Sequence, residues 1–292
     1  MLRTALVMCI FLSYGCSQET LIPTIPILKI TETYTPPSTH PKFTKDTTWI
    51  EDDMGMVMWA ADSNWRLDIH PWSYQVVTDT NDAVRKGWKS QRFEVRLGDC
   101  IGPDCERGPV WERREFGQVD GSEKELLSLS ARQGDEFWYG WSFYAPNQNR
   151  NSFNWVYISQ FQQTPHNNAV WMFLKREGKP LCLLFEPSKN KNHDCYKDTS
   201  FELIPDHLFM GRWHDLVVHA KWEKDSSGIF QVWVDGELKV NYTGYTMANE
   251  STSVPFKYGI YRQIQSSTSV LYFDEIRRRK TRDSVDIRIL EK

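Results

Sequence analysis

Three short runs of the sequence place polar or ionisable side chains at alternate positions, the spacing that puts them on one face of a β-strand. In the first run, residues 111–116 (WERREF), Arg113 and Glu115 share a face. An arginine held by a neighbouring carboxylate has a fixed, planar set of donors that suits a carboxylate ligand. The structural alternative is a solvated sheet face with cross-strand ion pairs.

A related run, residues 92–96 (RFEVR), alternates in the same way. Phe93 and Val95 face one side, and Arg92, Glu94 and Arg96 face the other. We expect Arg92 and Arg96 to contribute positive charge to the same ligand site, with a solvated face again as the alternative.

The second run, residues 158–163 (ISQFQQ), puts the amides of Gln160 and Gln162 on one face. Two amides side by side can hold a carboxylate or hydroxyl groups. The alternative here is simply the polar end of a strand.

The third run, residues 256–263 (FKYGIYRQ), has an apolar face at positions 256, 258 and 260, and alternation points Arg262 to that same face. Its other face carries Lys257, Gly259, Tyr261 and Gln263. Gly259 removes a side chain between Lys257 and Tyr261, which predicts that a ligand can approach the backbone there. A cation such as Lys257 or Arg113 would also help the phenol of Tyr261 to ionise.

The composition defines the class of protein. The chain has 292 residues, 40% hydrophobic and 25% charged, as expected of a soluble globular protein. A net charge of −3 gives no overall basic field, so we expect no nucleic-acid partner, and we expect a monomer. The 13 Trp, 12 Tyr and 15 Phe can fill a sandwich core or line a sugar groove.

Apolar residues alternate with period two along most of the chain, and no long helical pattern interrupts them. The sequence therefore predicts an all-β fold in which two sheets form one sandwich domain. The strands are expected at residues 126–131, 137–144, 156–162, 170–175, 181–185, 215–222, 230–234, 257–261 and 270–276.

The N-terminal residues are typical of an exported protein. Residues 1–17 combine Arg3 with an apolar stretch too short to span a bilayer, as a signal peptide does. Cys16 is a candidate for lipidation; simple cleavage and an uncleaved apolar N-terminus are the alternatives. Residues 18–48 are a Thr- and Pro-rich linker, and residues 49–292 form the domain. We expect a secreted, periplasmic or outer-surface protein, with any membrane contact through a lipid anchor.

Four further cysteines, Cys100, Cys105, Cys182 and Cys195, allow three disulfide pairings. The simplest is local, Cys100 with Cys105 and Cys182 with Cys195, which suits an exported protein. A zinc site is the alternative, although the sequence has no CxxC pair.

Taken together, these runs resemble the jelly-roll polysaccharide lyases, in particular the heparin lyase I-like family, with glucuronan lyases and alginate lyases of similar fold nearby. The resemblance covers residues 49–279. It rests on Arg-x-Glu at 113–115, the aromatic strand 137–146, Gln160, and Lys-x-Gly-Ile-Tyr-Arg at 257–262. The Trp-Val-Asp-Gly hairpin at 233–236 is weaker support, because many lectin-like sandwiches share it.

The resemblance implies cleavage of a uronic-acid polysaccharide by β-elimination. In that reaction the sugar carboxylate is neutralised, a base takes the C5 proton, and an acid protonates the departing O4. By resemblance, Arg113 and Gln160 neutralise the carboxylate, and Tyr261 is the acid and also a candidate base, assisted by Lys257. Further contacts with an anionic glycan are expected from Arg92, Arg96, Glu115, His166 and Gln263.

Gln162 departs from this pattern, because the family usually has a histidine two residues after the glutamine. A glutamine does not carry a proton at neutral pH. Either Tyr261 acts alone, or His166 reaches in from the following loop, or the protein binds glycans without cleaving them.

Two other classes of protein are alternatives to a lyase. The rival from another class is a non-catalytic glycan-binding protein of lectin-like fold. A retaining glycoside hydrolase needs two close carboxylates and ranks last, since its acidic strand motif is absent. The sequence requires no cofactor. Asp104, Asp235 and Asp274 are candidate calcium ligands, although no contiguous loop like an EF-hand contains them. His214 and His219 are expected on a structural strand of the far sheet.

Overall fold

The alternating apolar pattern produces antiparallel strands throughout the computed structural model of the chain. It describes residues 56–58, 70–79, 82–100, 104, 111–118, 130–148, 150–164, 168–186 and 200–292. The predictions for residues 1–17, Cys16, residues 18–48, Cys105, His166 and Cys195 lie outside these ranges, as does most of the strand expected at 126–131. All described residues belong to one compact unit, Phe43–Lys292.

The strands of the described residues are β1 (Met56–Met58), β2 (Tyr74–Thr78), β3 (Lys89–Val95), β4 (Trp111–Gln118), β5 (Glu136–Tyr144), β6 (Trp155–Gln163), β7 (Asn168–Arg176), β8 (Leu181–Phe185), β9 (Ser200–Ile204), β10 (Trp213–Lys221), β11 (Ile229–Val234), β12 (Glu237–Thr243), β13 (Phe256–Gln263) and β14 (Ser269–Arg279).

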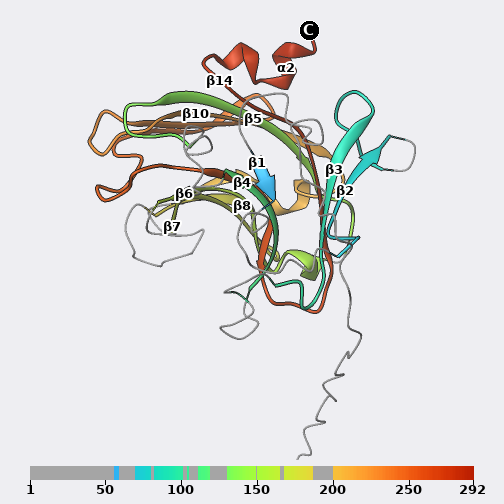
Figure 1. Cartoon of the computed structure of the whole chain (residues 1–292). Helices are drawn as coiled ribbons and strands as arrows, with labels where there is room; N and C mark the ends of the chain where they lie inside the picture. Colours follow the sequence, from blue (N-terminus) through green and yellow to red (C-terminus); the bar gives the residue numbers. More distant parts are fainter. Residues whose placement is uncertain are drawn as a thin grey trace, which may run out of the picture. The chain divides into compact units, whose positions relative to one another are not determined.

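The strands form two antiparallel sheets that stack face to face (Figure 1). Sheet A has the order β1-β4-β13-β6-β7-β8-β9, and sheet B has the order β12-β11-β10-β5-β14-β3-β2. Neighbouring strands in both sheets are often far apart in the sequence, which is typical of jelly-roll topology. The predicted all-β, two-sheet jelly-roll fold is confirmed.

The core between the sheets is rich in aromatic rings, because the inward positions of both sheets carry them. Phe161 and Phe256 of sheet A and Phe93 and Phe143 of sheet B are at most 1% exposed. Many of these rings meet edge to face, an arrangement that adds to the energy of simple burial. Packing of the core therefore accounts for many of the aromatic residues in the sequence.

Charged side chains also face this core where strand alternation points them inward. Arg262 on β13 and Glu112 on β4 are cross-strand partners, and both are fully buried. Glu112 Oε2 accepts from Arg262 Nε at 2.8 Å and lies 2.7 Å from the Nη2 atom. The placement of Arg262 with the core face is confirmed.

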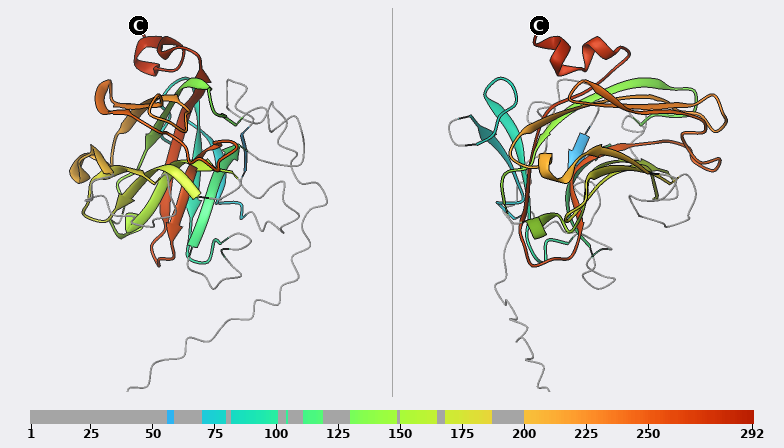
Figure 2. Two further views of the ribbon diagram at one scale, coloured as in Figure 1. Left: turned by 90° about the vertical axis from the view of Figure 1, so that its left-hand side faces the viewer. Right: turned by 180° about the vertical axis from the view of Figure 1, so that it is seen from behind.

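The helical elements among the described residues are short: η2 (Arg150–Phe153), η3 (Asp206–Leu208), η4 (Arg282–Ser284) and α2 (Ile287–Leu290). In Figures 1 and 2, α2 lies on the side of sheet B that faces away from sheet A. None of the helices in the described part of the chain is long and apolar enough to cross a bilayer.

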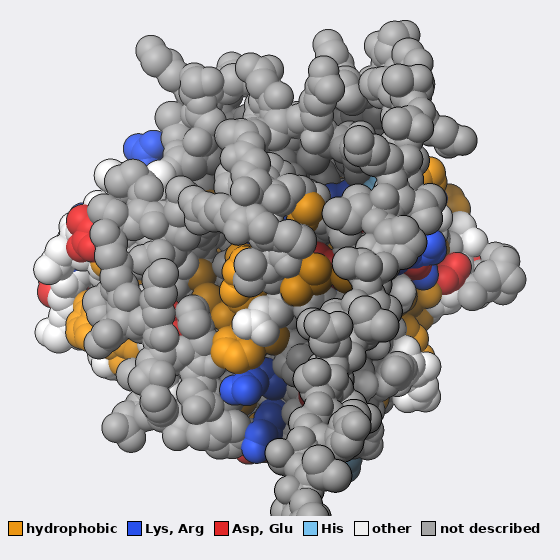
Figure 3. Space-filling model, turned by 90° about the horizontal axis from the view of Figure 1, so that it is seen from below, with side chains coloured by type: hydrophobic (Ala, Val, Ile, Leu, Met, Phe, Trp, Pro, Cys, Tyr) orange, Lys and Arg blue, Asp and Glu red, His pale blue; other side chains and the backbone are white. Residues whose placement is uncertain are grey.

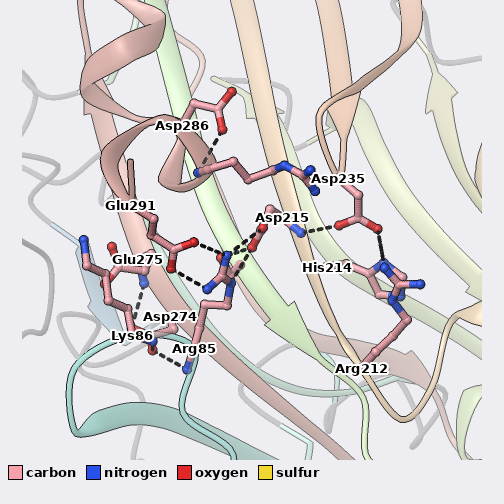
Figure 4. Close-up of polar contacts among 12 residues, drawn as sticks. Arg85, Lys86, Arg212, His214, Asp215, Asp235, Asp274, Glu275, Asp286 and Glu291 are labelled. Atoms are coloured by element: carbon pink, nitrogen blue, oxygen red, sulfur yellow. Dashed lines mark hydrogen bonds and ion pairs between the residues drawn. The ribbon is translucent and has the colours of Figure 1, made fainter.

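A polar network joins this C-terminal segment to sheet B (Figure 4). Arg85 donates to both carboxylate oxygens of Asp215, at 2.9 and 3.0 Å, and to both oxygens of Glu291, at 2.6 and 3.0 Å. Asp274 accepts the backbone N–H groups of Arg85 and Lys86 at 3.0 and 3.3 Å. Arg85 therefore links the loop before β3 to both β10 and the C-terminal end of the chain.

Candidate active site

The face of sheet A that points away from sheet B collects the residues that the sequence singled out. β13 pairs with β4 on one side and with β6 on the other. In register, Tyr261 lies opposite Arg113 and Tyr157, and Lys257 lies opposite Gly117 and Gln160. Three strands from distant parts of the sequence thus bring the predicted catalytic residues onto one surface. Figure 3 views the molecule from the side on which sheet A lies in Figure 1.

Arg113 is held from two directions. Its Nε donates to Asp104 Oδ2 at 2.6 Å, and its Nη1 lies 3.5 Å from Glu115 Oε2. The guanidinium carbon also lies 3.9 Å from the centre of the Tyr261 ring, a cation–π contact. The side chain is 11% exposed, so this positive charge is fixed in a largely dry position beside the tyrosine.

Glu115 connects Arg113 with the amide of Gln160. Gln160 Nε2 donates to Glu115 Oε1 at 2.7 Å, and the Glu115 carboxylate is completely buried. The hydrogen bond passes from β6 to β4 across β13, at the level where Gly259 lies opposite Glu115. The buried Glu115 carboxylate therefore fixes the positions of Arg113 and Gln160, the two groups expected to neutralise the substrate carboxylate.

The structure gives Gly259 a role within the sheet itself. Its φ of +134° is rarely adopted by L residues, and an added Cβ would lie 2.3 Å from the carbonyl oxygen of Arg114. The glycine is needed because the β4 backbone approaches closely and because Glu115 and Gln160 meet across it. The expected approach of a ligand to this backbone stays a prediction.

Aromatic side chains enclose Tyr261. The rings of Trp111 and Tyr157 lie 4.9 and 5.7 Å from it, centre to centre. Tyr157 also accepts a hydrogen bond from Trp155 Nε1 at 3.1 Å. Sequence reasoning missed this aromatic wall, although Trp111 is two positions before Arg113 and so belongs to the same strand face.

Burial sets the protonation of Lys257 and Tyr261, the two ionisable residues of β13 on this outer face. It raises the pKa of Tyr261 to about 12, against the opposing effect of the Arg113 charge. It lowers the pKa of Lys257 to about 8; Arg113 lowers it further, while Glu115 and Asp104 raise it. At neutral pH the tyrosine therefore keeps its proton, while the lysine is far easier to deprotonate than an exposed one.

The remaining candidates on this face are less enclosed. Gln162 lies on β6 opposite Ala169 and is partly exposed, in line with the predicted side-by-side placement of the two amides. Gln263 is the cross-strand partner of Trp111 and is also partly exposed.

Arg92 does not lie on the strands that form this site. It belongs to β3 in sheet B and pairs with Glu94, as does Arg96, which follows β3. The expectation that Arg92 lies on the same sheet as Arg113 is corrected, and the expected contact of Arg96 with a glycan stays a prediction. Alternation defines the face of a strand, but it does not tell which of the two sheets the strand joins.

The structure contradicts one of the two predicted disulfides and leaves the pairing of the other untested. Cys100 is disulfide-bonded, and its expected partner Cys105 lies outside the described residues, so their pairing stays a prediction. The expected Cys182–Cys195 disulfide is not formed: Cys182 is a fully buried thiol that donates to the carbonyl oxygen of Pro180, with the two atoms 3.6 Å apart. The physical reason is its position inside β8, where it packs with apolar neighbours such as Leu174 and Tyr157.

No group of three or more potential metal ligands occurs among the described residues. The three aspartates considered for calcium have other partners. Asp104 binds Arg113, Asp235 binds His214, and Asp274 accepts backbone N–H groups. His214 and His219 lie on β10 of sheet B, as expected for structural residues.

Comparisons with known proteins agree with the resemblance seen in the sequence. The family described as polysaccharide lyase matches residues 57–277. The endo-β-1,4-glucuronan lyase from the fungus Trichoderma reesei has a TM-score of 0.56 at 17% identity, covering 77% of this chain and 94% of that one. The alginate lyase A1-II′, of polysaccharide lyase family 7, has a TM-score of 0.49 at 10% identity, covering 70% and 82%. The comparison with curated proteins finds no match.

The similarity to the glucuronan lyase establishes a common fold. The resemblance seen in the sequence is confirmed at the level of polysaccharide lyases, and its narrower form, the heparin lyase I-like family, stays a prediction. Since the family match extends over most of the sequence, the chain belongs to the polysaccharide lyase family.

Proposed function

We propose that this lyase cleaves a uronic-acid-containing glycan by β-elimination on the outer face of sheet A. One observation carries the proposal: β4, β6 and β13 bring Arg113, Gln160, Lys257 and Tyr261 onto a single surface. The endo-β-1,4-glucuronan lyase from Trichoderma reesei shares the fold, and its name refers to a uronate polysaccharide.

Carboxylate neutralisation suits Arg113 and Gln160. The C5 proton of a uronate becomes more acidic when its carboxylate charge is compensated, because the developing enolate is then stabilised. Asp104 and Glu115 fix the arginine, and Glu115 also fixes the amide. Such preorganised donors need little rearrangement when the negative charge develops.

Tyr261 suits protonation of the departing O4. Burial raises the pKa of Tyr261 to about 12, so its hydroxyl is protonated at neutral pH and can donate. The adjacent guanidinium of Arg113 would stabilise the phenolate that forms after proton transfer.

The experiment is incubation of the protein with heparin, heparan sulfate, glucuronan and alginate, while the ultraviolet absorbance of the unsaturated uronate product is followed. We expect a rise with one glycan and its loss in Tyr261→Phe. Tyr242→Phe, on β12 of sheet B, is the matched control that removes a hydroxyl away from the site. Binding of a glycan without any rise would contradict elimination and favour the glycan-binding alternative.

Gln162→His tests the departure from the family pattern. If the remaining site is intact, this variant preserves or raises the rate of elimination. A strong loss would show that the Gln162 amide has a function of its own.

We also propose that the protein is exported, through the signal-like residues 1–17, and that Cys16 is a candidate lipid anchor. Mass spectrometry of the mature N-terminus tests this: a lipid-modified Cys16 or a cleaved N-terminus supports export, and an intact Met1 contradicts it.

A further inference from the structure

The elimination needs a group that accepts the C5 proton, and few side chains at this site can do so. Arg113 stays protonated, and the amides of Gln160 and Gln162 are not bases. Tyr261 holds its proton because burial raises its pKa to about 12. The described residues of this surface that can accept a proton include Lys257 and the carboxylates of Glu115 and Asp104.

Both carboxylates are committed to the neutralising groups. Glu115 Oε1 accepts from Gln160 at 2.7 Å, and its Oε2 faces Arg113 Nη1 at 3.5 Å. Asp104 Oδ2 accepts from Arg113 Nε at 2.6 Å. Protonation of either one would weaken the groups that must hold the substrate carboxylate.

Lys257 differs in position and in surroundings. Its side chain is buried and runs across Gly117, where an added Cβ would lie 3.0 Å from Lys257 Cγ and 3.3 Å from its Cε. It lies on the same face and the same strand as Tyr261 and opposite Gln160. The charged groups around it are Arg113 and Glu115 of β4 and Asp104, and burial with these charges brings its pKa to about 8.

We propose that Lys257 is the base that removes the C5 proton, an inference that rests on the proposed elimination. The C5–H bond breaks and its proton joins the lone pair of Nζ. The C5 electron pair forms the C4=C5 double bond, the C4–O4 bond breaks, and O4 takes the proton of the Tyr261 hydroxyl. The Lys257 ammonium then returns its proton to the Tyr261 phenolate, directly or through water, and the site is restored.

With Lys257 as the base and Tyr261 as the acid, the elimination does not require the histidine that the family usually has at the position of Gln162. The final proton transfer is favourable, since it runs from an amine of lower pKa to a phenolate of higher pKa. The two residues have separate roles, lysine as base and tyrosine as acid, because their environments shift their pKa values in opposite directions.

The pH dependence of Lys257→Arg and wild type separates a base from a fixed cation. A base predicts that kcat/KM of the wild type rises with pH through about 8. It also predicts that Lys257→Arg loses ~100-fold or more in kcat, with a much smaller change in substrate binding. A cation that merely neutralises predicts the reverse: activity falls above that pH, and arginine replaces lysine with little loss. That result would overturn the inference.

Glu115→Gln provides a second, linked readout. Removing the Glu115 charge lowers the pKa of Lys257, so the rising limb of kcat/KM moves to lower pH, whatever the change in overall rate. A limb that stays in place, or moves to higher pH, would contradict Lys257 as its origin.

Titration by NMR keeps the inference testable without turnover. In protein labelled with 13C-lysine, the Cε signal that disappears in Lys257→Arg is followed against pH. A midpoint near 8 supports the base, and a midpoint above about 10, the value of an ordinary lysine, overturns it. A wild-type enzyme that is inactive on every glycan counts instead against the proposed elimination.

Discussion

Replacing Arg262 with methionine tests how the core supports the site above it. The arginine and its partner Glu112 are both fully buried and belong to the strands that carry Tyr261 and Arg113. Arg262 Nη1 also donates to Ser267 O at 2.6 Å and to Ser269 Oγ at 2.7 Å. In Arg262→Met, Glu112 keeps the backbone N–H of Gly98 as a donor, at 2.5 Å, but loses its countercharge.

Removing one partner of a buried ion pair costs about 3–5 kcal/mol, because the other charge stays desolvated. Burial is already unfavourable for both ions, since it raises the pKa of Glu112 and lowers that of Arg262. For a protein of this size each kcal/mol lowers Tm by about 2–4 °C, so we expect a decrease of about 6–20 °C. The loss should shrink at pH 5, where the unpaired Glu112 takes up a proton more readily.

Urea denaturation followed by tryptophan fluorescence measures this free energy of unfolding, with the midpoint shifting at unchanged m-value. The matched control is the double variant Arg262→Met/Glu112→Leu, which removes both charges and should recover most of the loss. A loss below about 1 kcal/mol in the single variant, or a double variant no more stable than the single one, would refute the reasoning.

Three further predictions concern other parts of the fold. Arg85→Ala leaves the buried Asp215 carboxylate without its cation. It should lower the free energy of unfolding, measured by urea titration, by about 2–4 kcal/mol. A loss under about 0.5 kcal/mol would be inconsistent with a stabilising role of the Arg85 network. Gly259→Ala should prevent normal folding, judged by circular dichroism, because the added Cβ would lie 2.3 Å from the β4 backbone. The control Gly178→Ala also has a positive φ but open space around it, so it should lower the free energy of unfolding by only about 1 kcal/mol. Equal effects of the two substitutions would contradict the close approach of β4. Burial raises the pKa of Asp274 to about 6, so the folded state binds this proton more tightly than the unfolded state does. The stability that this proton contributes is therefore lost as pH rises from about 4 to 6. Asp274→Asn should flatten this pH dependence of the free energy of unfolding, and an unchanged slope would exclude Asp274 as its cause.

Much of the fold follows from strand periodicity alone. The run 181–185 coincides with β8, and the predicted strands at 137–144 and 230–234 differ from β5 and β11 by one residue at one end. β12 and β9 were missed, because β12 has few buried residues and β9 follows a stretch without clear alternation. Local patterns specify a strand well when one of its faces is buried throughout.

The site was predictable as a set of faces but not as a set of contacts. Alternation correctly placed Arg113, Glu115 and Tyr261 on one side of their strands and Arg262 on the other. It could not show that Glu115 bonds to Gln160 across a third strand, since that depends on sheet order. The same limit explains the error for Arg92, whose run has the correct spacing but belongs to sheet B.

The strand order β4-β13-β6 has a consequence for how the enzyme becomes active during folding. β4 and β13 are neighbours in space although most of the domain lies between them in the sequence, so their pairing closes a long loop. Non-local pairing of this kind is slow, and topologies dominated by it fold in milliseconds to seconds. Arg113 meets Tyr261 only when this pairing is complete. Recovery of activity after dilution from urea would therefore time the closure of sheet A and should lag behind the early burial of tryptophan.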